Sequence, residues 1–373
     1  MRVLMTAPPL ADVLSPGGIY KVIREIARNL SKRGHEVIVL QLNPLNRPNE
    51  EYHDGFKIIR VNSKHFYGLS FGVYSYLKKH FNELNPDVIH VHGYHTLFSP
   101  ELIYVIERSY PTLPIVFSPH LDVARSTFAG KYFWGVYNFF IGKRTFELVD
   151  HIISPSEFEA KTLAHQFGIS LDKISIIPHG VDIINTEKPL KQRDKIHLLY
   201  SGYLIKRKRV DYILESLHSL VYDFGVEDVV LTIIGDGPER KKLLKLAEKL
   251  GISDKIEWKS FLPREELIEE IRNADVFLLL SESEAYGIIV AEALALGTPV
   301  IVTKRTALRE FLNESGCFGV DYPPNPREVA ELILKIVNSD IKVGPFSKKI
   351  RTWDKVVRDY ERVYYHVLQE GSS

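Results

Sequence analysis

The stretch from Ser281 to Val302, SESEAYGIIVAEALALGTPVIV, contains a glutamate whose helical neighbours are all apolar. Its central part has helical spacing, and Gly297 and Pro299 are the residues that would end the helix. The neighbours three and four positions from Glu292 are Ile288, Ile289, Ala295 and Leu296. A carboxylate in such surroundings costs free energy unless a donor hydrogen-bonds it. Glu292 is therefore expected to hold a partner from outside this helix.

The same stretch indicates the fold, because an apolar strand (275–281), a turn, a helix and a second strand (299–303) follow one another. This alternation continues along the chain and is typical of parallel sheets with crossover helices. The remaining expected strands are 2–6, 36–40, 56–61, 87–92, 114–118, 151–156, 173–178, 196–202, 229–237 and 255–261. One helical face between the first two strands comprises Val22, Ile23, Ile26, Ala27 and Leu30.

The 373 residues fit two domains of ordinary size. A polar stretch without periodicity, INTEKPLKQRDK, follows Asp182 and marks a linker. We expect an α/β protein with two Rossmann-like, doubly wound domains (1–185 and 186–350) that face each other across a cleft. A long amphipathic helix, expected over 347–370, belongs to a terminal segment (351–373) that returns to the first domain. Ligands of such domains bind at the carboxyl ends of the strands.

The composition argues against several classes of protein. The 48 Lys and Arg nearly balance the 47 Asp and Glu, which does not favour nucleic acid as the partner. The single Cys excludes an internal disulfide framework. The first residues lack the pattern of a signal peptide, so we expect a cytoplasmic protein. Many charged residues beside two Met and one Cys raise the hypothesis of a thermophilic source, which a melting temperature in the mesophile range would contradict.

Two acids lie at the βα turn of the opening stretch. Glu284 is in the turn and Glu292 is eight residues later on the helix. A helix that starts at the carboxyl edge of a parallel strand presents N–H groups and a positive dipole end to an anion. Beside an anion site, carboxylates suit the vicinal hydroxyls of a ribose or sugar. The alternative is that Glu292 pairs with a buried Lys or Arg and that Glu284 is solvated.

Four consecutive bases follow the first strand of the second half, at another βα turn. The bases are Lys206, Arg207, Lys208 and Arg209. Such a run is usually a solvated surface segment, but at a strand end it could compensate a diphosphate. The next βα turn carries Gly235 and Gly237, which would let backbone approach a ligand.

The first half has its own candidates at strand ends. Gly17 and Gly18 begin a helix and form either a backbone anion cradle or an ordinary turn. His120 and Asp122 follow the strand 114–118. The histidine either caps the next helix or meets a substrate.

The stretch from Glu282, ESEAYGIIVAEALALGTPVIV, resembles the E-x7-E signature of retaining glycosyltransferases of family four (glycosyl transferases group 1), which have the GT-B fold and use nucleotide sugars. The resemblance covers nearly the whole chain. Its further motifs are PGG (16–18), SPH (118–120), IIPHGVD (176–182), SGYLIKRKRVD (201–211), IIGDGPE (233–239) and the closing helix with Trp353.

The resemblance implies a role for each matched residue. Glu284 would contact the transferred sugar, Glu292 the nucleotide ribose and Lys208 the diphosphate. His120 would orient the sugar, so His120, Glu284 and Lys208 are the catalytic candidates. The other donor-binding candidates are Gly17, Gly18, Gly202, Arg207, Arg209, Gly235, Tyr286, Gly287 and Ile288. The first domain would bind the acceptor and the second the nucleotide sugar.

The chain departs from the family pattern at two positions. Tyr203 stands where the family usually has Arg, and Arg207 or Arg209 could replace that cation. Ala285 stands where the family usually has Gly, and Ala tolerates positive φ less well.

The resemblance further implies transfer with retention of anomeric configuration, without a metal or other cofactor. No Asp-x-Asp follows a strand, in agreement with metal independence. The acceptor would be a saccharide, a lipid-linked or a small-molecule hydroxyl.

An aromatic segment in the first half, residues 128–144, mixes rings with bases. The candidates for acceptor or membrane contact are Tyr132, Trp134, Lys143 and Arg144. Aromatic and basic residues together can lie in a membrane interface, which would be peripheral docking on the inner face of a membrane. The alternative is a helix packed on the sheet.

Three other functions remain open from the sequence. A nucleotide-sugar epimerase of the same architecture would use similar carboxylates without an acceptor. His90 and His92 share one face of a strand, with His95 nearby, and could bind zinc in a hydrolase. A nucleotide-binding module without activity is the third possibility.

Overall fold

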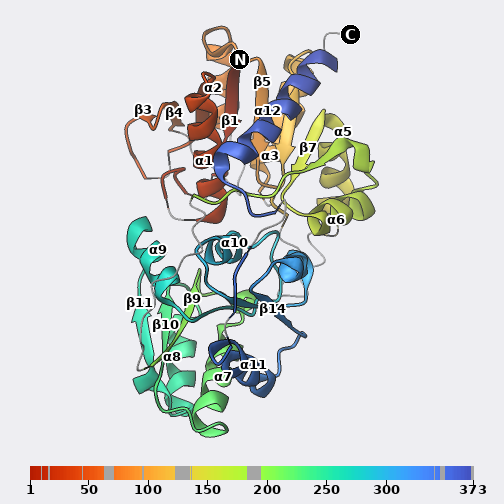
Figure 1. The fold of residues 1–373 in the computed structure, drawn as a ribbon. Coiled ribbons are helices and arrows are strands. Elements are labelled where there is room, and N and C mark those ends of the chain that lie inside the picture. The colour runs from red at the N-terminus through yellow and green to blue at the C-terminus, as the bar shows by residue number, and fades with distance from the viewer. Residues whose placement is uncertain are drawn as a thin grey trace. The chain divides into compact units, whose positions relative to one another are not determined.

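The computed structural model describes residues 1–9, 11–15, 17–43, 45–62, 71–94, 96–121, 135, 137–182, 195–339, 341–344 and 349–370. The chain divides into two compact units: unit 1 is Met1–Gly180 with Trp353–Ser373, and unit 2 is Val181–Thr352. Both units are parallel-sheet, Rossmann-like α/β structures, so the predicted fold class is confirmed (Figure 1). The boundaries between the units, at 180/181 and 352/353, lie a few residues from the expected boundaries at 185/186 and 350/351.

Unit 1 is built on an eight-stranded sheet. Its strands are β1 (Arg2–Thr6), β2 (Glu36–Leu42), β3 (Glu50–His53), β4 (Phe56–Val61), β5 (Val88–His92), β6 (Ile115–Ser118), β7 (His151–Ser154) and β8 (Ile174–Ile176). They lie in the order β3-β4-β2-β1-β5-β6-β7-β8, and all neighbours pair in parallel except β3 with β4. The helices of unit 1 are α1 (Gly18–Lys32), α2 (Phe71–Leu84), α3 (Phe98–Ser109), a π-helical turn (Asn138–Gly142), α5 (Lys143–Leu148), α6 (Glu157–Phe167) and α12 (Trp353–Glu370).

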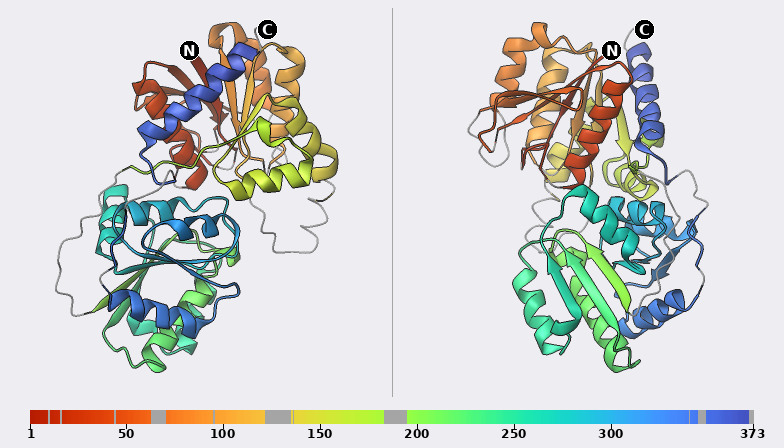
Figure 2. Two further views of the ribbon diagram at one scale, coloured as in Figure 1. Left: turned by 45° about the vertical axis from the view of Figure 1, so that its right-hand side comes forward. Right: turned by 60° about the vertical axis from the view of Figure 1, so that its left-hand side comes forward.

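Helix α12 returns to unit 1, as the sequence predicts, and lies beside α1 (Figure 2). Glu361 of α12 accepts hydrogen bonds at 2.7 Å from Arg33 and at 2.6 Å from His35, both just after α1. The helix begins at Trp353 and not at the predicted 347 because Thr352 forms a parallel bridge with Val181. The predicted apolar face of α1 is buried.

Unit 2 is built on a six-stranded, wholly parallel sheet. Its strands are β9 (Ile196–Ser201), β10 (Val229–Ile234), β11 (Ile256–Lys259), β12 (Val276–Leu279), β13 (Val300–Thr303) and β14 (Cys317–Val320). They lie in the order β11-β10-β9-β12-β13-β14. The α-helices are α7 (Val210–Tyr222), α8 (Arg240–Lys249), α9 (Arg264–Asn273), α10 (Ile288–Ala295) and α11 (Pro326–Val337), and the 3-10 segments include Lys206–Lys208 and Thr306–Asn313.

Two strands, β3 and β14, are absent from the sequence prediction. Both lie at a sheet edge and are only partly buried, so neither has the apolar run that marks a central strand. The other strands have buried apolar residues, except β11, whose Ile256 and Trp258 are partly buried against the core of unit 2, and each unit has one core.

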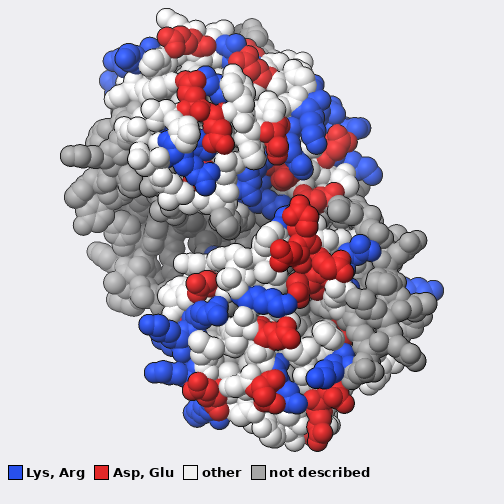
Figure 3. All heavy atoms as spheres, turned by 90° about the vertical axis from the view of Figure 1, so that its left-hand side faces the viewer, with Lys and Arg blue, Asp and Glu red and all other residues white. Residues whose placement is uncertain are grey.

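Among the residues described, no helix has the length and apolar character needed to cross a bilayer. On the face drawn in Figure 3, basic and acidic side chains are interspersed over both units.

Candidate functional site

The switch point of the unit 2 sheet lies at β9. The chain leaves β9 for β10 on one side, and β12 lies on the other, so the loops after β9 and β12 flank the place where such sheets bind ligands. These loops carry the two groups of residues singled out in the sequence, the four bases and the Glu284 turn. Both groups therefore come to the same sheet edge of unit 2.

Lys208 and Glu284 meet directly. The Lys208 ammonium donates a hydrogen bond of 2.5 Å to Glu284 Oε1. Glu284 is only 8% exposed, so the alternative of a solvated Glu284 is wrong. A buried carboxylate and a cation at a strand end form a local site that can receive both an anion and hydroxyl groups.

Arg207 ties the two loops together. Its carbonyl accepts a hydrogen bond of 2.8 Å from Glu282 N–H, and its guanidinium donates at 3.3 Å to the carbonyl of Ser283. Burial acts to raise the pKa of Glu284, but Lys208 and Arg207 outweigh it and hold that pKa below its usual value. Glu284 is therefore an ionised acceptor at neutral pH.

The other two bases of the run point elsewhere. Arg209 has a φ of 50° and donates to the Asp211 carboxylate at 2.7 Å and to Tyr322 Oη at 2.8 Å. Lys206 is exposed. Of the two proposed replacements for the missing family arginine, Arg207 is thus the one that contacts the Glu284 loop.

Glu292 has a partner that the sequence did not identify. Arg264, the first residue of α9, donates to both Glu292 oxygens, at 2.6 and 3.1 Å, and to Asp182 at 2.9 Å. Glu292 is 3% exposed, so the alternative of a buried pair with Arg is what this structure shows. A carboxylate has about four acceptor positions. The two bonds from Arg264 occupy two of these positions and fix the orientation of the carboxylate.

A signal for Arg264 was present in the sequence. PREE at the start of a helix places a cation at the positive end of the helix dipole, where cations are unfavourable. Such an arginine needs carboxylate partners, and Asp182 and Glu292 supply them.

The start of α10 has the geometry expected of a backbone anion site. Gly287 precedes the helix with a φ of 101°, and among the described residues no side chain caps it. Ile288 begins the helix and is half-buried. Ala285 is absent from the described residues with positive φ, so it needs no glycine. The Tyr286 side chain is buried and donates to the carbonyl of Lys349 at 3.0 Å, which leaves only its backbone for a ligand.

Gly202 and Gly235 lie in neighbouring loops at the carboxyl end of the unit 2 sheet and pack closely against each other. A Cβ at Gly235 would lie 2.0 Å from the carbonyl oxygen of Gly202, and a Cβ at Gly237 would lie 2.4 Å from that of Leu204. The sequence interpretation was that Gly235 and Gly237 let backbone approach a ligand; in the structure the missing Cβ atoms let two loops approach each other.

Unit 1 brings together a histidine cluster at the carboxyl ends of β5 and β6. His92 Nδ1 and His120 Nε2 are 3.1 Å apart, and the rings of His90 and His92 are 3.9 Å apart. His179 lies 5.8 Å from His120 between ring centroids. Burial holds the pKa of His90, His92 and His179 well below the usual value, so these three are neutral. His120 is the least buried of the four.

The two glycines at the start of α1 are exposed. Gly17 has a φ of 145°, and no cap bond from a side chain is found at this position within the described chain. Gly18 is the first helical residue. The geometry fits either a backbone anion cradle or an uncapped turn.

The aromatic segment is described only in part. Asp122, Tyr132 and Trp134 lie outside the described residues. Phe139 and Phe140 are 75% and 71% exposed, and Lys143 and Arg144 are exposed one turn further on. Tyr137, in contrast, is buried against Tyr94 with ring centroids 5.4 Å apart.

Both ring nitrogens of His90 are engaged, with Tyr364 Oη at 2.7 Å and Ser118 Oγ at 2.9 Å. His90 is therefore committed to packing and not to a metal. His95 lies outside the described residues. In the described ranges no set of three or more His, Cys, Asp or Glu is arranged as a metal site.

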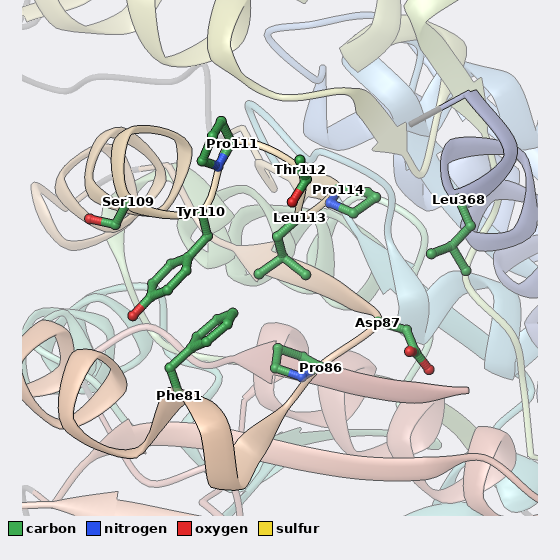
Figure 4. A pocket seen from close by; sticks show the side chains of 10 residues that line it. All are labelled: Phe81, Pro86, Asp87, Ser109, Tyr110, Pro111, Thr112, Leu113, Pro114 and Leu368. Carbon is green, nitrogen blue, oxygen red and sulfur yellow. The ribbon is translucent and has the colours of Figure 1, made fainter. Parts of the chain in front are cut away.

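A pocket of about 410 Å³ in unit 1 lies away from these strand ends (Figure 4). Asp87 and Pro114, which precede β5 and β6, line it together with the stacked rings of Phe81 and Tyr110. It is thus at the amino edge of the sheet, where Rossmann-like folds do not bind their ligands.

Family models match both units. Residues 16–184 match Glycosyltransferase Family 4, and residues 182–353 match Glycosyl transferases group 1. The chain belongs to glycosyltransferase family four. The resemblance stated from the E-x7-E stretch is confirmed, and the protein is a glycosyltransferase of the GT-B type.

Two similar proteins align with most of the length of this glycosyltransferase. An uncharacterized glycosyltransferase of Methanocaldococcus jannaschii is 24% identical over 93% of this chain and 94% of its own. The alpha-monoglucosyldiacylglycerol synthase of Streptococcus pneumoniae is 23% identical over 89% of this chain and 78% of its own.

Solved structures share the fold. Sucrose-phosphate synthase from Thermosynechococcus elongatus has a TM-score of 0.80 at 18% identity and covers 99% of both chains. Anabaena HepE, solved in complex with UDP and glucose, has a TM-score of 0.70 at 15% identity, over 99% of this chain and 98% of its own.

Proposed function

We propose that this glycosyltransferase moves a sugar from a nucleoside diphosphate sugar to a hydroxyl acceptor, with retention of anomeric configuration and without a metal or other cofactor. The observation that carries the proposal is the Lys208–Glu284 contact at the switch point of unit 2. A cation and an ionised carboxylate side by side match a diphosphate next to sugar hydroxyls. Because HepE was solved with UDP and glucose, a UDP-sugar is the first donor to test.

Unit 2 supplies most donor contacts in the proposal. Lys208, Arg207 and the N-terminus of α10 bind the diphosphate, and Glu284 holds the sugar. Glu292, fixed by Arg264, accepts hydrogen bonds from the ribose. Unit 1 contributes Gly17 and Gly18 to the donor phosphates, and His120 orients the sugar.

In the proposed step the bond between the anomeric carbon and the diphosphate oxygen breaks, and a bond from that carbon to the acceptor oxygen forms on the same face. The acceptor proton passes to the leaving phosphate oxygen, so the products are the nucleoside diphosphate and the glycoside. Lys208 and the α10 dipole stabilise the charge that develops on the diphosphate. No side chain is required as a strong base.

The test is turnover of a panel of UDP-, GDP-, ADP- and TDP-sugars with saccharide, lipid-linked and small-molecule acceptors. We expect one donor to be consumed in an acceptor-dependent reaction and the product to have the donor's anomeric configuration by NMR. An inverted product would contradict retention. Activity abolished by EDTA and restored by a divalent cation would contradict metal independence.

The epimerase alternative predicts a different outcome in the same assay. A nucleotide sugar incubated alone would change its sugar, whereas a transferase leaves the sugar unchanged until an acceptor is added. The buried carboxylates suit both reactions, so the experiment without acceptor decides between them.

We also propose peripheral contact of unit 1 with an anionic membrane on the cytoplasmic side. Phe139 and Phe140 expose two adjacent rings near Lys143 and Arg144. Exposed aromatic rings with neighbouring bases are typical of segments that bind the interface of an anionic membrane. Co-sedimentation with anionic liposomes should fall in Phe139→Ser/Phe140→Ser, while Phe261→Ser, at an exposed ring of unit 2, should bind like wild type. Equal sedimentation of all three proteins would contradict the proposal.

A further inference from the structure

Unit 1 contains a buried carboxylate that the proposed reaction does not use. Glu159, in the first turn of α6, is 0% exposed. It accepts hydrogen bonds from the backbone N–H of Leu121 and, at 3.1 Å, from Ser154 Oγ. Within the described residues no Lys or Arg pairs with it. Burying a carboxylate among neutral donors costs free energy, so the structure must gain something from the two bonds that Glu159 accepts.

The donor Leu121 directly follows His120, so Glu159 holds the turn that carries the proposed sugar-orienting residue. His120 has a φ of 49°, a left-handed conformation that non-glycine residues rarely adopt. The residues before it are anchored to the end of β5 by hydrogen bonds of 2.9 Å from Gly93 N–H to Ser118 O and from Tyr94 N–H to Pro119 O. After His120, the Glu159 carboxylate is the anchor.

The His120 ring also has a fixed neighbour. Its Nε2 lies 3.1 Å from Nδ1 of His92, which is fully buried. The ring makes this contact from a left-handed backbone at His120, so a change of that backbone would redirect the ring. Glu159 therefore acts on the direction of the ring through the Leu121 N–H.

We propose that Glu159 is a positioning residue, which holds the His120 turn so that the imidazole is pre-oriented toward the sugar. The proposal rests on the sugar-orienting role of His120 in the proposed function. Ser154 completes the arrangement, because its hydroxyl holds the second carboxylate oxygen. Glu159 itself touches neither donor nor acceptor in this scheme.

The experiment compares Glu159→Leu, which has no acceptor, with Glu159→Gln, whose amide oxygen can still accept from Leu121 N–H. We expect Glu159→Leu to lower kcat at least 10-fold with KM for the nucleotide sugar changed less than threefold. Glu159→Gln should keep kcat within about threefold. The control is Glu157→Leu, an exposed position of the same helical turn, and it should match wild type.

A double-mutant cycle separates positioning from general destabilisation. In the His120→Ala background, Glu159→Leu should cause no further loss of kcat, because it acts through the missing ring. An equal loss in both backgrounds, or a loss in Glu159→Gln as large as in Glu159→Leu, overturns the proposal. If Glu159→Leu does not fold, Ser154→Ala takes its place in the cycle, with a smaller loss that should also vanish without His120.

A second readout does not depend on activity. Imidazole ¹H–¹⁵N spectra should show His120 hydrogen-bonded to His92 in wild type and in Glu159→Gln, and should lose that signature in Glu159→Leu. Unchanged spectra in Glu159→Leu contradict the positioning role. If wild type transfers no sugar but the spectra respond as expected, the proposed function fails while the structural link between Glu159 and His120 stands.

Discussion

Glu284 in unit 2 and Glu159 in unit 1 are both buried carboxylates near strand ends, yet their surroundings differ. Lys208 and Arg207 compensate Glu284, and its pKa lies below the usual value although burial opposes this. Glu159 has only neutral donors, and burial raises its pKa to about 7. A cation at contact distance therefore decides whether a buried carboxyl group stays charged and can serve a ligand, or serves as an acceptor for backbone N–H groups.

Lys208→Met should produce the largest effect, because it removes both the proposed diphosphate contact and the partner of Glu284. We expect turnover to fall between about 100- and 1,000-fold. Steady-state kinetics with the identified donor measures it. Lys206→Met, with the same charge change at an exposed position two residues away, should remain within about twofold of wild type. Similar losses in the two variants would refute a specific role for Lys208.

Removing the charge of Glu284 together with that of Lys208 should separate the effect of the pair on stability from its effect on turnover. Breaking a buried ion pair by removing one partner leaves an uncompensated charge. Lys208→Met/Glu284→Gln should therefore be more stable than Lys208→Met alone but remain inactive. Recovery of turnover in the double variant would show that the pair serves folding only.

The stability contributed by Glu159 should depend on pH with the sign of a raised pKa. Its pKa is about 7 in the folded chain against 4.5 in the unfolded one. The contribution is complete below pH 4.5 and is lost as the pH rises through 7. The free energy of unfolding of wild type relative to Glu159→Gln should thus fall by about 3 kcal/mol over this range. Among the described residues, Tyr360 of α12 is a titratable group that interacts with Glu159, and burial raises the pKa of Tyr360 above the usual value, so it stays neutral throughout.

Denaturant unfolding at several pH values measures this difference, with Glu157→Gln as the exposed control. A difference that does not change between pH 4.5 and 7 would mean that Glu159 is charged in the folded protein like Glu284. The two acids would then not differ as described.

Arg264→Gln should have a smaller effect, since its side chain is 31% exposed. It leaves Glu292 without its bidentate partner, and we expect the free energy of unfolding to fall by about 2 kcal/mol, less than for a fully buried pair. Nucleotide affinity should fall about tenfold because the carboxylate loses its fixed orientation. Calorimetric titration with the nucleoside diphosphate and denaturant unfolding measure the two quantities. Arg309→Gln, at an exposed position, is the control, and an equal effect there would sink the assignment.

Glu284→Gln should give the smallest change in stability. The stability contributed by Glu284 should be lost toward acid pH, opposite to the pH dependence of the Glu159 contribution. Because the pKa of Glu284 is lowered in the folded chain, its contribution is present above pH 4.5 and is lost as the pH falls through the folded value. Acid unfolding of wild type and Glu284→Gln should therefore converge at low pH. A difference that grows toward acid would contradict the paired state of Glu284.

The sequence predicted those features that depend on local patterns. Alternating strands and helices identified two Rossmann-like units, and the βα turns identified Lys208 and Glu284, which meet in the structure. The periodic face of α1 was predicted because helical spacing is a property of neighbouring residues.

The features that the sequence did not predict depend on contacts between distant segments. Arg264 and Glu292 are 28 residues apart, and Leu121 and Glu159 are 38 apart. The close approach of the Gly202 carbonyl to Gly235 is likewise not visible in the sequence, because the two residues belong to different loops. Edge strands such as β3 have too few buried residues to give a pattern.

Nucleotide binding by the Lys208–Glu284 site tests the central claim most directly. Thermal shift with UDP, GDP, ADP, TDP and their sugars should stabilise wild type and Lys206→Met with one nucleotide, by about 2.7 kcal/mol at a concentration 100 times the Kd. The same nucleotide should leave Lys208→Met and Glu292→Ala nearly unshifted. If no nucleotide stabilises wild type, or if Lys208→Met is stabilised as much as Lys206→Met, the account of this site is wrong.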